Sequence, residues 1–234
     1  MRYEINEKLF SDIPGLPIAY WLSTQSIISF KNTSLAKCGV AQEGIKTGNN
    51  DVFLRYWFEV VIDRTNINGD NKEKWLKTSK AGENRKWYGS HYIVTNFEGN
   101  GQEMLKTGHA SLTGIKNFFK PAITWNRIGT ENLSFRYLPN DFLQNMGGLC
   151  FYPNTTSDFN YILAFLNSSV SHLQLNVLNP TMSFPPGTIN SLSIKYDSNQ
   201  FKLVNSITQE CINFAKQNWD SFETSWDFKK HPLI

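Results

Sequence analysis

The stretch FFKPAITWNRI, residues 118–128, decides the fold class together with two short runs that follow it, NLSFRYL at 132–138 and GGLCFYP at 147–153. Each run is rich in aromatic and β-branched residues, and turn-forming Gly, Asn and Pro separate it from its neighbour, which is typical of short strands. Pro121 has no backbone N–H to donate, so it restricts the first run to a sheet edge or to a strand start. This region is therefore predicted to form three short strands joined by turns.

Two upstream segments extend the same pattern. HYIVTNF at 91–97 predicts a strand, with a hairpin turn at the following Gly99–Gly101, and DVFLRYWFEVVIDR at 51–64 predicts a short helical turn that leads into a strand. Strands and helices do not alternate as they do in a doubly wound sheet. We therefore expect an α+β fold, with a mixed, mostly antiparallel sheet of short strands and flanking helices, in a single domain over residues 1–234.

Three helical segments are predicted around this sheet. A helix over 18–30 belongs to a helical lead-in at 1–30, and a core helix over 159–178 is expected to be capped by Asp158. An amphipathic C-terminal helix is expected over 205–228, where apolar residues recur at steps of three and four. That stripe consists of Ile207, Cys211, Ala215, Trp219, Phe222 and Trp226.

The composition is that of a folded chain in a reducing compartment. Of its 234 residues, 40% are hydrophobic and 18% are charged, which allows a sizeable core and argues against disorder. Cys38, Cys150 and Cys211 are widely separated, which disfavours a disulfide framework or a zinc site. The first residues lack the apolar region of a signal peptide, and no run reaches the roughly 18 apolar residues of a membrane span. We expect a cytoplasmic protein.

Positive charge is concentrated in the middle of the chain. Residues 71–139 carry 11 Lys or Arg against 5 Asp or Glu, whereas the segments 1–70 and 140–234 are each slightly acidic. A localised basic field attracts phosphate and makes binding dependent on salt. A solvated, lysine-rich loop is the alternative that charge counting alone leaves open.

The loop KAGENRKWYG, 80–89, is the first candidate for contact with nucleic acid. It combines three cations with two aromatic residues and contains two glycines, and Lys and Arg are rarely buried without a partner. Arg binds guanine or phosphate through two hydrogen bonds, whereas Lys acts as a point charge. We expect one aromatic residue to stack on an unpaired or flipped base and the other to anchor the loop. The candidates are Lys80, Arg85, Lys86, Trp87 and Tyr88.

Two further segments supply secondary candidates for DNA contact. GIKTGNND at 44–51 offers Lys46, Thr47, Asn49 and Asn50, although local chemistry alone favours a turn that uses Asn and Gly for their backbone freedom. TWNRIGTENLSFRY at 124–137 offers Thr124, Asn126, Arg127, Ser134 and Arg136, of which Arg127 and Arg136 are the main candidates. Arg136 alternates with two aromatic residues along a strand, so we expect it to point outward if they lie in the core.

Recognisable catalytic and metal-binding patterns are absent from the sequence. The four histidines, His91, His109, His172 and His231, lie in different segments without metal-ligand spacing, so we expect each to be hydrogen-bonded or exposed. The chain has no nucleophile elbow and no phosphate-binding loop. We therefore predict no catalytic residues, no metal and no cofactor in this chain.

Seven motifs in order resemble a known family. They are IPGLPIAYW (13–21), GIKTGNNDVFLRYWFEV (44–60), ENRKWYG (83–89), ITWNRIGTENLSFRYLP (123–139), LAFLNSS (163–169), LNPTMSF (178–184) and NWDSFETSWDF (218–228). Together they resemble the region that follows the catalytic domain in PglX proteins, the adenine-specific DNA methyltransferases of BREX phage-defence systems. The resemblance runs from about residue 13 to residue 233.

The resemblance implies a DNA target-recognition domain that does not methylate DNA by itself. In such enzymes an N-terminal domain binds S-adenosylmethionine and methylates adenine N6, while the following region reads the duplex as the adenine flips out. The catalytic [N/D]-P-P-[Y/F] signature is absent, because Asn179–Pro180 and Pro185–Pro186 are separated here. S-adenosylmethionine is thus expected in a separate catalytic domain. The implied partners are double-stranded DNA, that catalytic domain and other defence-system proteins.

Two other functions compete with this interpretation. The chain is alternatively a protein-interaction module that docks a methyltransferase, another defence component or a phage inhibitor, with exposed aromatic residues at its interface. A nuclease is the third candidate function, and it requires clustered carboxylates that hold Mg²⁺. The acidic residues of the basic region show no such spacing; they are Glu73, Glu83, Glu98, Glu103 and Glu131.

Overall fold

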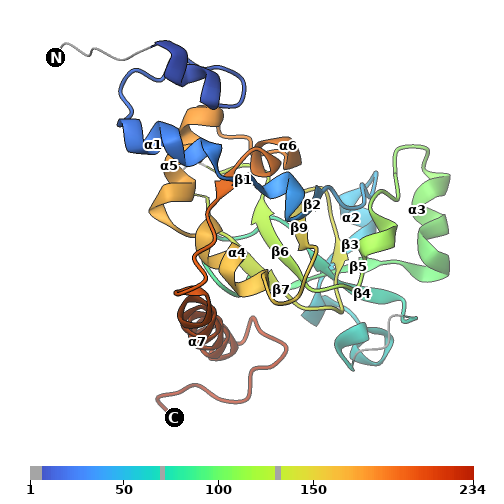
Figure 1. Ribbon diagram of the computed structural model, residues 1–234. Coiled ribbons are helices and arrows are strands. Elements are labelled where there is room, and N and C mark those ends of the chain that lie inside the picture. Colours follow the sequence, from blue (N-terminus) through green and yellow to red (C-terminus); the bar gives the residue numbers. More distant parts are fainter. Residues whose placement is uncertain (1–6, 69–71, 130–132) are drawn as a thin grey trace.

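A four-stranded antiparallel sheet forms the centre of the molecule. The computed structural model describes residues 7–68, 72–129 and 133–234 (Figure 1). The sheet has the order β2-β9-β6-β7, with β2 at Gly39–Gln42, β6 at Ala122–Asn126, β7 at Arg136–Leu138 and β9 at Gly148–Pro153. Ile123 pairs with Phe151 on one side and with Tyr137 on the other. Pro121 directly precedes β6, as expected for a proline at a strand start.

Both faces of this sheet are buried, and the strand alternation decides which residue lies on which face. Trp125 and Phe151 lie on the face that packs against the helices, in one large hydrophobic cluster. Cys150 and Tyr152 flank Phe151 along β9, and together with Phe142 they belong to a second cluster on the opposite face. A sheet covered on both sides requires strands that are apolar at nearly every position. That requirement explains the continuous apolar run in β9.

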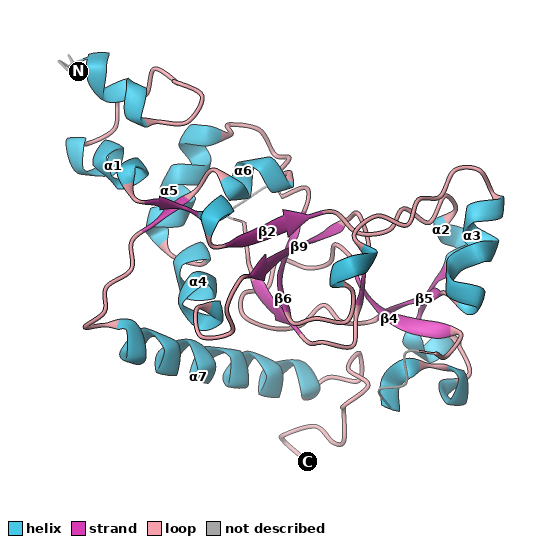
Figure 2. Ribbon diagram, turned by 45° about the vertical axis from the view of Figure 1, so that its right-hand side comes forward, coloured by secondary structure: helices cyan, strands magenta, loops and turns pink. Residues whose placement is uncertain are grey.

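Helices cover the first face. These are α4 (Phe159–Leu166), α5 (Ser169–Leu178), α6 (Pro186–Asn190) and α7 (Phe201–Asp220). Figure 2 shows α7 as a long rod beside α4, on the far side of α4 from α5 and α6. Strand β1 (Thr33–Ser34) pairs with β10 (Ser193–Ile194), and α1 (Thr24–Ile28) packs through Ile27 against the start of the chain and against Val177 of α5.

A second sheet lies against the opposite face. Its order is β3-β5-β4-β8, with β3 at Leu54–Tyr56, β4 at Trp75–Ser79, β5 at Ile93–Asn96 and β8 at Leu143–Gln144. Ser79 of β4 hydrogen bonds to Thr124 of β6 at 2.9 Å, which ties the two sheets together. Helices α2 (Asn50–Phe53) and α3 (Gln102–Lys106) flank this second sheet. Short 3-10 segments occur at Glu7–Asp12, Ser29–Lys31, Leu35–Lys37, Trp57–Glu59, Ile62–Arg64, Asn66–Asn68, Glu98–Gly101 and Ile115–Asn117.

The predicted α+β class and the antiparallel strands are confirmed. Among the named strands of the described residues, every pairing is antiparallel except that of β4 with β8. The helical turn that leads into a strand at 51–64 is confirmed as α2 followed by β3. The prediction of a hairpin turn at Gly99–Gly101 is wrong, because positive φ angles at Gly99, Asn100 and Gly101 lead the chain into α3 instead.

Two helix predictions near the N-terminus and the centre need correction. The helix expected over 18–30 begins only at Thr24, because Ser23 caps it by accepting a hydrogen bond from the Ser26 N–H. The helix expected over 159–178 is broken into α4 and α5 where Ser168 caps the second helix in the same way. Asp158 makes no capping bond, since its carboxylate accepts from the Thr155 hydroxyl instead.

The C-terminal helix spans Phe201–Asp220 rather than 205–228. Its buried residues are Thr208, Ile212 and Trp219, whereas Ile207 and Phe222 of the predicted stripe are exposed. In the first half of the helix the buried face is therefore rotated by about one residue, whereas Trp219 of the predicted stripe is buried as expected. Packing against α4 and the 80–89 loop, rather than apolarity alone, determines which side chains are covered. After Asp220 the chain continues in turns.

Gly44 is expected to tolerate no larger residue. A Cβ atom at this position would lie 2.0 Å from the backbone oxygen of Gln144. The Gln144 carbonyl cannot withdraw, since it accepts a hydrogen bond of 2.7 Å from the Ile45 N–H. We expect Gly44→Ala to lower the free energy of unfolding by roughly 1–3 kcal/mol or more, as overpacking does. Urea denaturation followed by circular dichroism measures the effect.

Gly187→Ala is the matched control for that substitution. Gly187 lies in α6, and a Cβ atom there would meet nothing within 4 Å. Alanine is the better helix former, so this variant is expected to be as stable as the unmodified chain or slightly more stable. Equal stability of the Gly44 and Gly187 variants would contradict the close approach at Gly44.

Candidate nucleic-acid interface

The basic loop at 80–92 connects β4 to β5 and crosses from the second sheet to the edge of the first. At that edge the Trp87 N–H donates to the Phe135 carbonyl at 2.9 Å, and the Tyr137 N–H donates to the Trp87 carbonyl at 2.8 Å. Trp87 adopts a φ of +72°, which is uncommon for a residue other than glycine and persists only where surrounding contacts hold it. The loop is therefore anchored by its backbone as well as by its side chains.

Arg136 lies beneath this loop and does not point outward as expected. Only 1% of its surface is exposed, and its guanidinium donates to the Glu83 carbonyl at 3.3 Å and to Asn126 Oδ1 at 2.9 Å. Asn126 in turn donates to the Gly82 carbonyl at 2.8 Å. Burial lowers the pKa of Arg136 to about 10, so the guanidinium stays charged at neutral pH. The prediction was wrong because the loop covers the outer face of β7.

A groove opens between the loop and α7. It has a volume of 520 Å³, and its described lining residues include no Asp or Glu. Arg85 is held in place there, because its guanidinium donates to Asn218 at 2.6 Å and lies 5.2 Å from the Trp219 ring. It also lies 3.6 Å from the exposed Glu83 carboxylate, which is outside the lining. The loop contributes Arg85, Lys86, Trp87 and Tyr88 to the lining, and α7 contributes Cys211, Phe214, Ala215 and Asn218. We call this the Arg85 groove.

The two aromatic residues of the loop differ in exposure. Tyr88 is 5% exposed and packs in the main core, so it is the residue that anchors the loop. Trp87 is half-buried and remains at the groove. Lys86 is exposed, and its amine donates to the Asn167 carbonyl at 3.2 Å. Gly89 permits the close approach to α7, since a Cβ there would lie 3.0 Å from the Trp219 ring.

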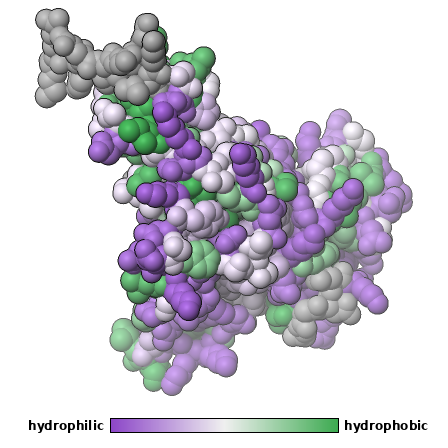
Figure 3. All heavy atoms as spheres, in the orientation of Figure 1, coloured by the Kyte–Doolittle hydropathy of each residue, from purple (hydrophilic) through white to green (hydrophobic). Residues whose placement is uncertain are grey.

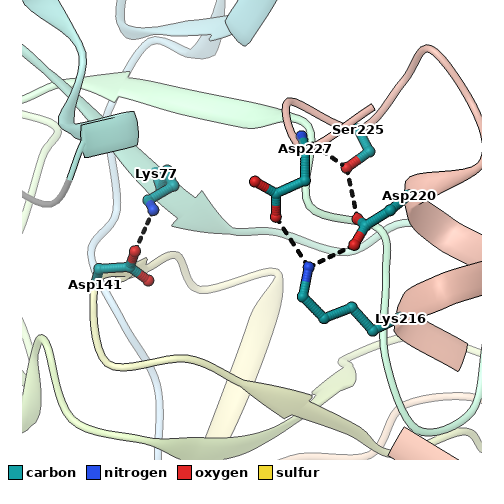
Figure 4. A network of polar contacts seen from close by, with 6 residues as sticks. All are labelled: Lys77, Asp141, Lys216, Asp220, Ser225 and Asp227. Carbon is teal, nitrogen blue, oxygen red and sulfur yellow. Dashed lines mark hydrogen bonds and ion pairs between the residues drawn. The ribbon is translucent and has the colours of Figure 1, made fainter. Parts of the chain in front are cut away.

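Ion pairs keep α7 and the segment after it against the loop. The Lys216 amine lies 2.5 Å from Asp220 and 2.9 Å from Asp227, and Ser225 donates to Asp220 (Figure 4). The same amine lies 5.3 Å from the centre of the Tyr88 ring. Although burial opposes it, hydrogen bonding to the two carboxylates raises the pKa of Lys216, which therefore remains charged. Lys77 pairs with Asp141 nearby, on the second sheet's side of this network.

His91 departs from the expectation that each histidine is hydrogen-bonded or exposed. It is buried among aromatic rings, 4.7 Å from both Tyr88 and Phe142, and neither ring nitrogen has a hydrogen-bond partner among the described residues. Burial and the nearby cations Arg136 and Lys77 hold its pKa well below the usual value. His91 is thus a neutral packing residue beneath the loop.

The structure separates Lys80 from the Arg85 groove. Lys80 is half-buried and lines a second groove of 330 Å³ beside β3, together with Asn50, Arg55 and Tyr56. Burial lowers the pKa of Lys80. This second groove also contains Asp51 and Glu59, so its charge is mixed. The cations expected to act together on one loop therefore belong to two different surfaces.

The remaining candidates have mainly structural contacts. Asn49 caps α2 by accepting from the Val52 N–H at 3.3 Å, and Thr47 is buried and donates to Asn50 at 2.6 Å. Lys46 is exposed, with its backbone paired to Ser111. Arg127 forms an ion pair of 2.5 Å with Glu43. Thr47 is thus removed from any surface, whereas Lys46 and Asn50 stay accessible; Thr124 and Ser134 are buried as well.

Comparison with known proteins places this geometry in context. The chain is 34% identical over 229 residues to an adenine-specific methyltransferase BrxX of Escherichia coli O9:H4 (strain HS), an alignment that covers 96% of this chain and 18% of that protein. It is 33% identical over 247 residues to an adenine-specific methyltransferase PglX of Lacticaseibacillus casei (strain Zhang), covering 99% and 20% respectively. The chain is homologous to these methyltransferases. No protein-family model matches it.

The resemblance to PglX that the ordered motifs indicated is thereby confirmed. The chain spans about a fifth of the length of these relatives. Within the described ranges, no three His, Cys, Asp or Glu side chains come together as metal ligands, and no helix is long and apolar enough to cross a membrane. Glu131, considered for the nuclease alternative, lies outside the described residues.

Sequence reasoning missed the contribution of α7 to the groove. Phe214 is 68% exposed and Asn218 binds Arg85, yet neither belongs to the predicted apolar stripe. A signal for Phe214 was present, because a large aromatic residue on the polar side of an amphipathic helix has no place in the core. Asn218 offered no such signal, since an exposed asparagine on a helix is ordinary.

Proposed function

We propose that this chain recognises a DNA sequence for an adenine-N6 DNA methyltransferase of a BREX-type phage-defence system. The observation that carries the proposal is the Arg85 groove, whose lining presents Arg85 and Lys86 and contains no Asp or Glu. The one carboxylate paired with Arg85 among the described residues is that of Glu83, at 3.6 Å and outside the lining. Homology to BrxX and PglX supplies the setting, since both are adenine-specific methyltransferases. In this proposal the methyl transfer and the S-adenosylmethionine belong to a catalytic domain, and the chain works with that domain and with other defence proteins in the cytoplasm.

The groove suits a duplex for electrostatic and geometric reasons. Lys86 is exposed and places a point charge at the rim, where it can neutralise a phosphate. Arg85 is already oriented by Asn218 and Trp219, so little side-chain entropy is lost when it forms two hydrogen bonds to guanine or to phosphate. The bonds from Arg136 and Asn126 to the backbone at Glu83 and Gly82 hold the loop that carries both cations.

Reversal of the charge at Lys86 tests the proposal. We expect Lys86→Glu to weaken binding to a mixed-sequence duplex roughly tenfold at low salt and to reduce the salt-dependence slope by about one or more, because a phosphate contact is lost. Fluorescence anisotropy across a salt series measures both quantities. Among the described residues, the Lys86 side chain gives up one hydrogen bond in this variant, that to the Asn167 carbonyl.

Lys116→Glu provides the matched control. Lys116 is exposed in a 3-10 turn outside the Arg85 groove, and its replacement changes the net charge by the same amount. If both variants bind the duplex equally, the groove is not the DNA site. A wild-type chain that binds no duplex even at low salt would overturn the proposed recognition role.

A protein-interaction module is the second candidate, favoured by one surface. Exposed large hydrophobic residues gather within residues 16–28, beside a groove of 620 Å³ between this segment and α5. These residues are Leu16, Ile18, Tyr20, Trp21 and Ile28. Exposed apolar clusters mark protein contacts more often than nucleic-acid contacts. A methyltransferase or another defence component docked here would resist salt, whereas duplex binding weakens with it.

A further inference from the structure

Aromatic side chains face the Arg85 groove from both of its walls. Trp87 lines it from the loop, and Phe214 lines it from α7 with 68% of its surface exposed. Figure 3 shows hydrophobic residues among the hydrophilic ones at the lower end of the molecule, where Figure 1 places α7 and the C-terminus. An exposed phenylalanine gains nothing from contact with phosphate. Binding of a duplex backbone alone would therefore leave the aromatic side chains of the groove without a role.

An unpaired nucleotide is the ligand that matches this combination. Bases within a duplex are covered on both faces by their neighbours, whereas an unpaired base exposes a flat surface that stacks on aromatic residues, and its phosphate is attracted to cations. Arg85 and Lys86 supply the cations, and the lining itself contains no carboxylate. The nearby Glu83 carboxylate, which pairs with Arg85 at 3.6 Å, is exposed and gives up this weak contact when a phosphate binds. The Lys80 groove fits less well, because Asp51 and Glu59 line it.

We propose that the Arg85 groove holds a single unpaired DNA nucleotide. Its base stacks on Phe214 and Trp87, and its phosphate lies at Lys86 and Arg85. The proposal rests on the proposed function in one respect, that DNA is the source of the nucleotide. It adds that the groove selects DNA in which one base has left the stack, rather than a continuous duplex.

The walls of the groove are held in place before any ligand arrives. The loop wall is fixed by the backbone bonds of Trp87 to Phe135 and Tyr137. The helix wall is fixed to the loop by the bond from Arg85 to Asn218 and by the packing of Lys216 over Tyr88. A preformed site loses little entropy on binding, so a modest stacking surface is sufficient for selection.

Paired duplexes test the inference. One duplex is fully paired and is called the flush duplex. The other has the same sequence with one additional, bulged 2-aminopurine, a base whose fluorescence is quenched when it stacks. We expect this chain to bind the bulged duplex roughly tenfold more tightly, as one base–aromatic stack provides, and to quench the 2-aminopurine. Phe214→Ala is expected to remove both effects while the affinity for the flush duplex stays unchanged.

Phe222→Ala is the matched control, because Phe222 is also exposed but does not line the groove. It is expected to keep the tenfold preference. Equal binding of the two duplexes by the wild-type chain, or a preference that survives Phe214→Ala, would overturn the inference.

The same titrations separate this inference from the proposed function. Binding of the flush duplex without a preference for the bulge retains the recognition role and rejects the nucleotide site. Binding of the bulged duplex alone supports the nucleotide site and rejects recognition of an intact duplex. Binding of neither rejects both.

Discussion

Trp125→Ala is expected to lower the free energy of unfolding by about 3–5 kcal/mol, the range for loss of a buried large aromatic side chain. Trp125 is completely buried in β6, and its ring lies 6.0 Å from that of Phe135. Its indole N–H donates to the Phe184 carbonyl at 2.9 Å. The substitution leaves a cavity between the sheet and the helices, and it also leaves a buried carbonyl without its donor.

Urea denaturation followed by far-ultraviolet circular dichroism measures this loss. Trp21→Ala is the matched control, because Trp21 is 55% exposed and its removal creates no cavity in the core. Surface substitutions of this kind change stability by roughly 0.5 kcal/mol or less. If the two variants unfold at the same urea concentration, Trp125 does not hold the sheet to the helices as described.

Arg136→Ala is expected to cost roughly 3 kcal/mol and to release the 80–89 loop. Hydrogen bonds from a charged group contribute about 1.5–3 kcal/mol each, and Arg136 donates to Glu83 and to Asn126. Without the guanidinium, the Glu83 carbonyl keeps the Arg85 N–H as a donor at 3.0 Å, but the side chain that joins the loop to β7 and to Asn126 is lost. Trypsin cleaves after Lys and Arg, so faster cleavage at Arg85 and Lys86 reports the release, beside urea denaturation for the stability.

Two further variants make that result specific. Arg127→Ala removes an arginine whose ion pair with Glu43 is partly exposed, so its cost is expected to be about 1 kcal/mol or less, with the loop still protected. Arg136→Lys keeps the positive charge but lacks the planar guanidinium that donates to both Glu83 and Asn126, so we expect a rate of trypsin cleavage between those of the wild type and of Arg136→Ala. Cleavage of Arg136→Ala at the wild-type rate would show that the loop is held by other contacts.

The strands were predictable because their residues carry the information locally. In the runs around Trp125 and Phe151, aromatic and β-branched residues lie between turn formers, and the structure places β6 and β9 there. Helix boundaries were less predictable. Ser23 and Ser168 begin helices because each side chain accepts from an N–H three residues later, and many serines with similar neighbours do not.

The candidate site was also predictable only in part. The sequence alone predicted that cations and aromatic residues gather at 80–89, and the structure places Arg85, Lys86 and Trp87 at one groove. It did not predict that Lys80 lies in another groove, or that α7 contributes Phe214 and Asn218 from more than 120 residues away along the chain. Proximity between distant segments has no local signature in the sequence.

Arg136 illustrates why the burial of a side chain could not be predicted from the sequence alone. Alternation along β7 predicted an outward side chain, and that inference assumed that the outer face of the strand meets water. The loop from the second sheet covers that face, so the guanidinium is buried and binds the backbone of the loop. The sequence by itself determined the kinds of element, the family resemblance and the charge of the loop. Only the tertiary structure decided which of those charges face solvent, because burial depends on segments far apart in the chain.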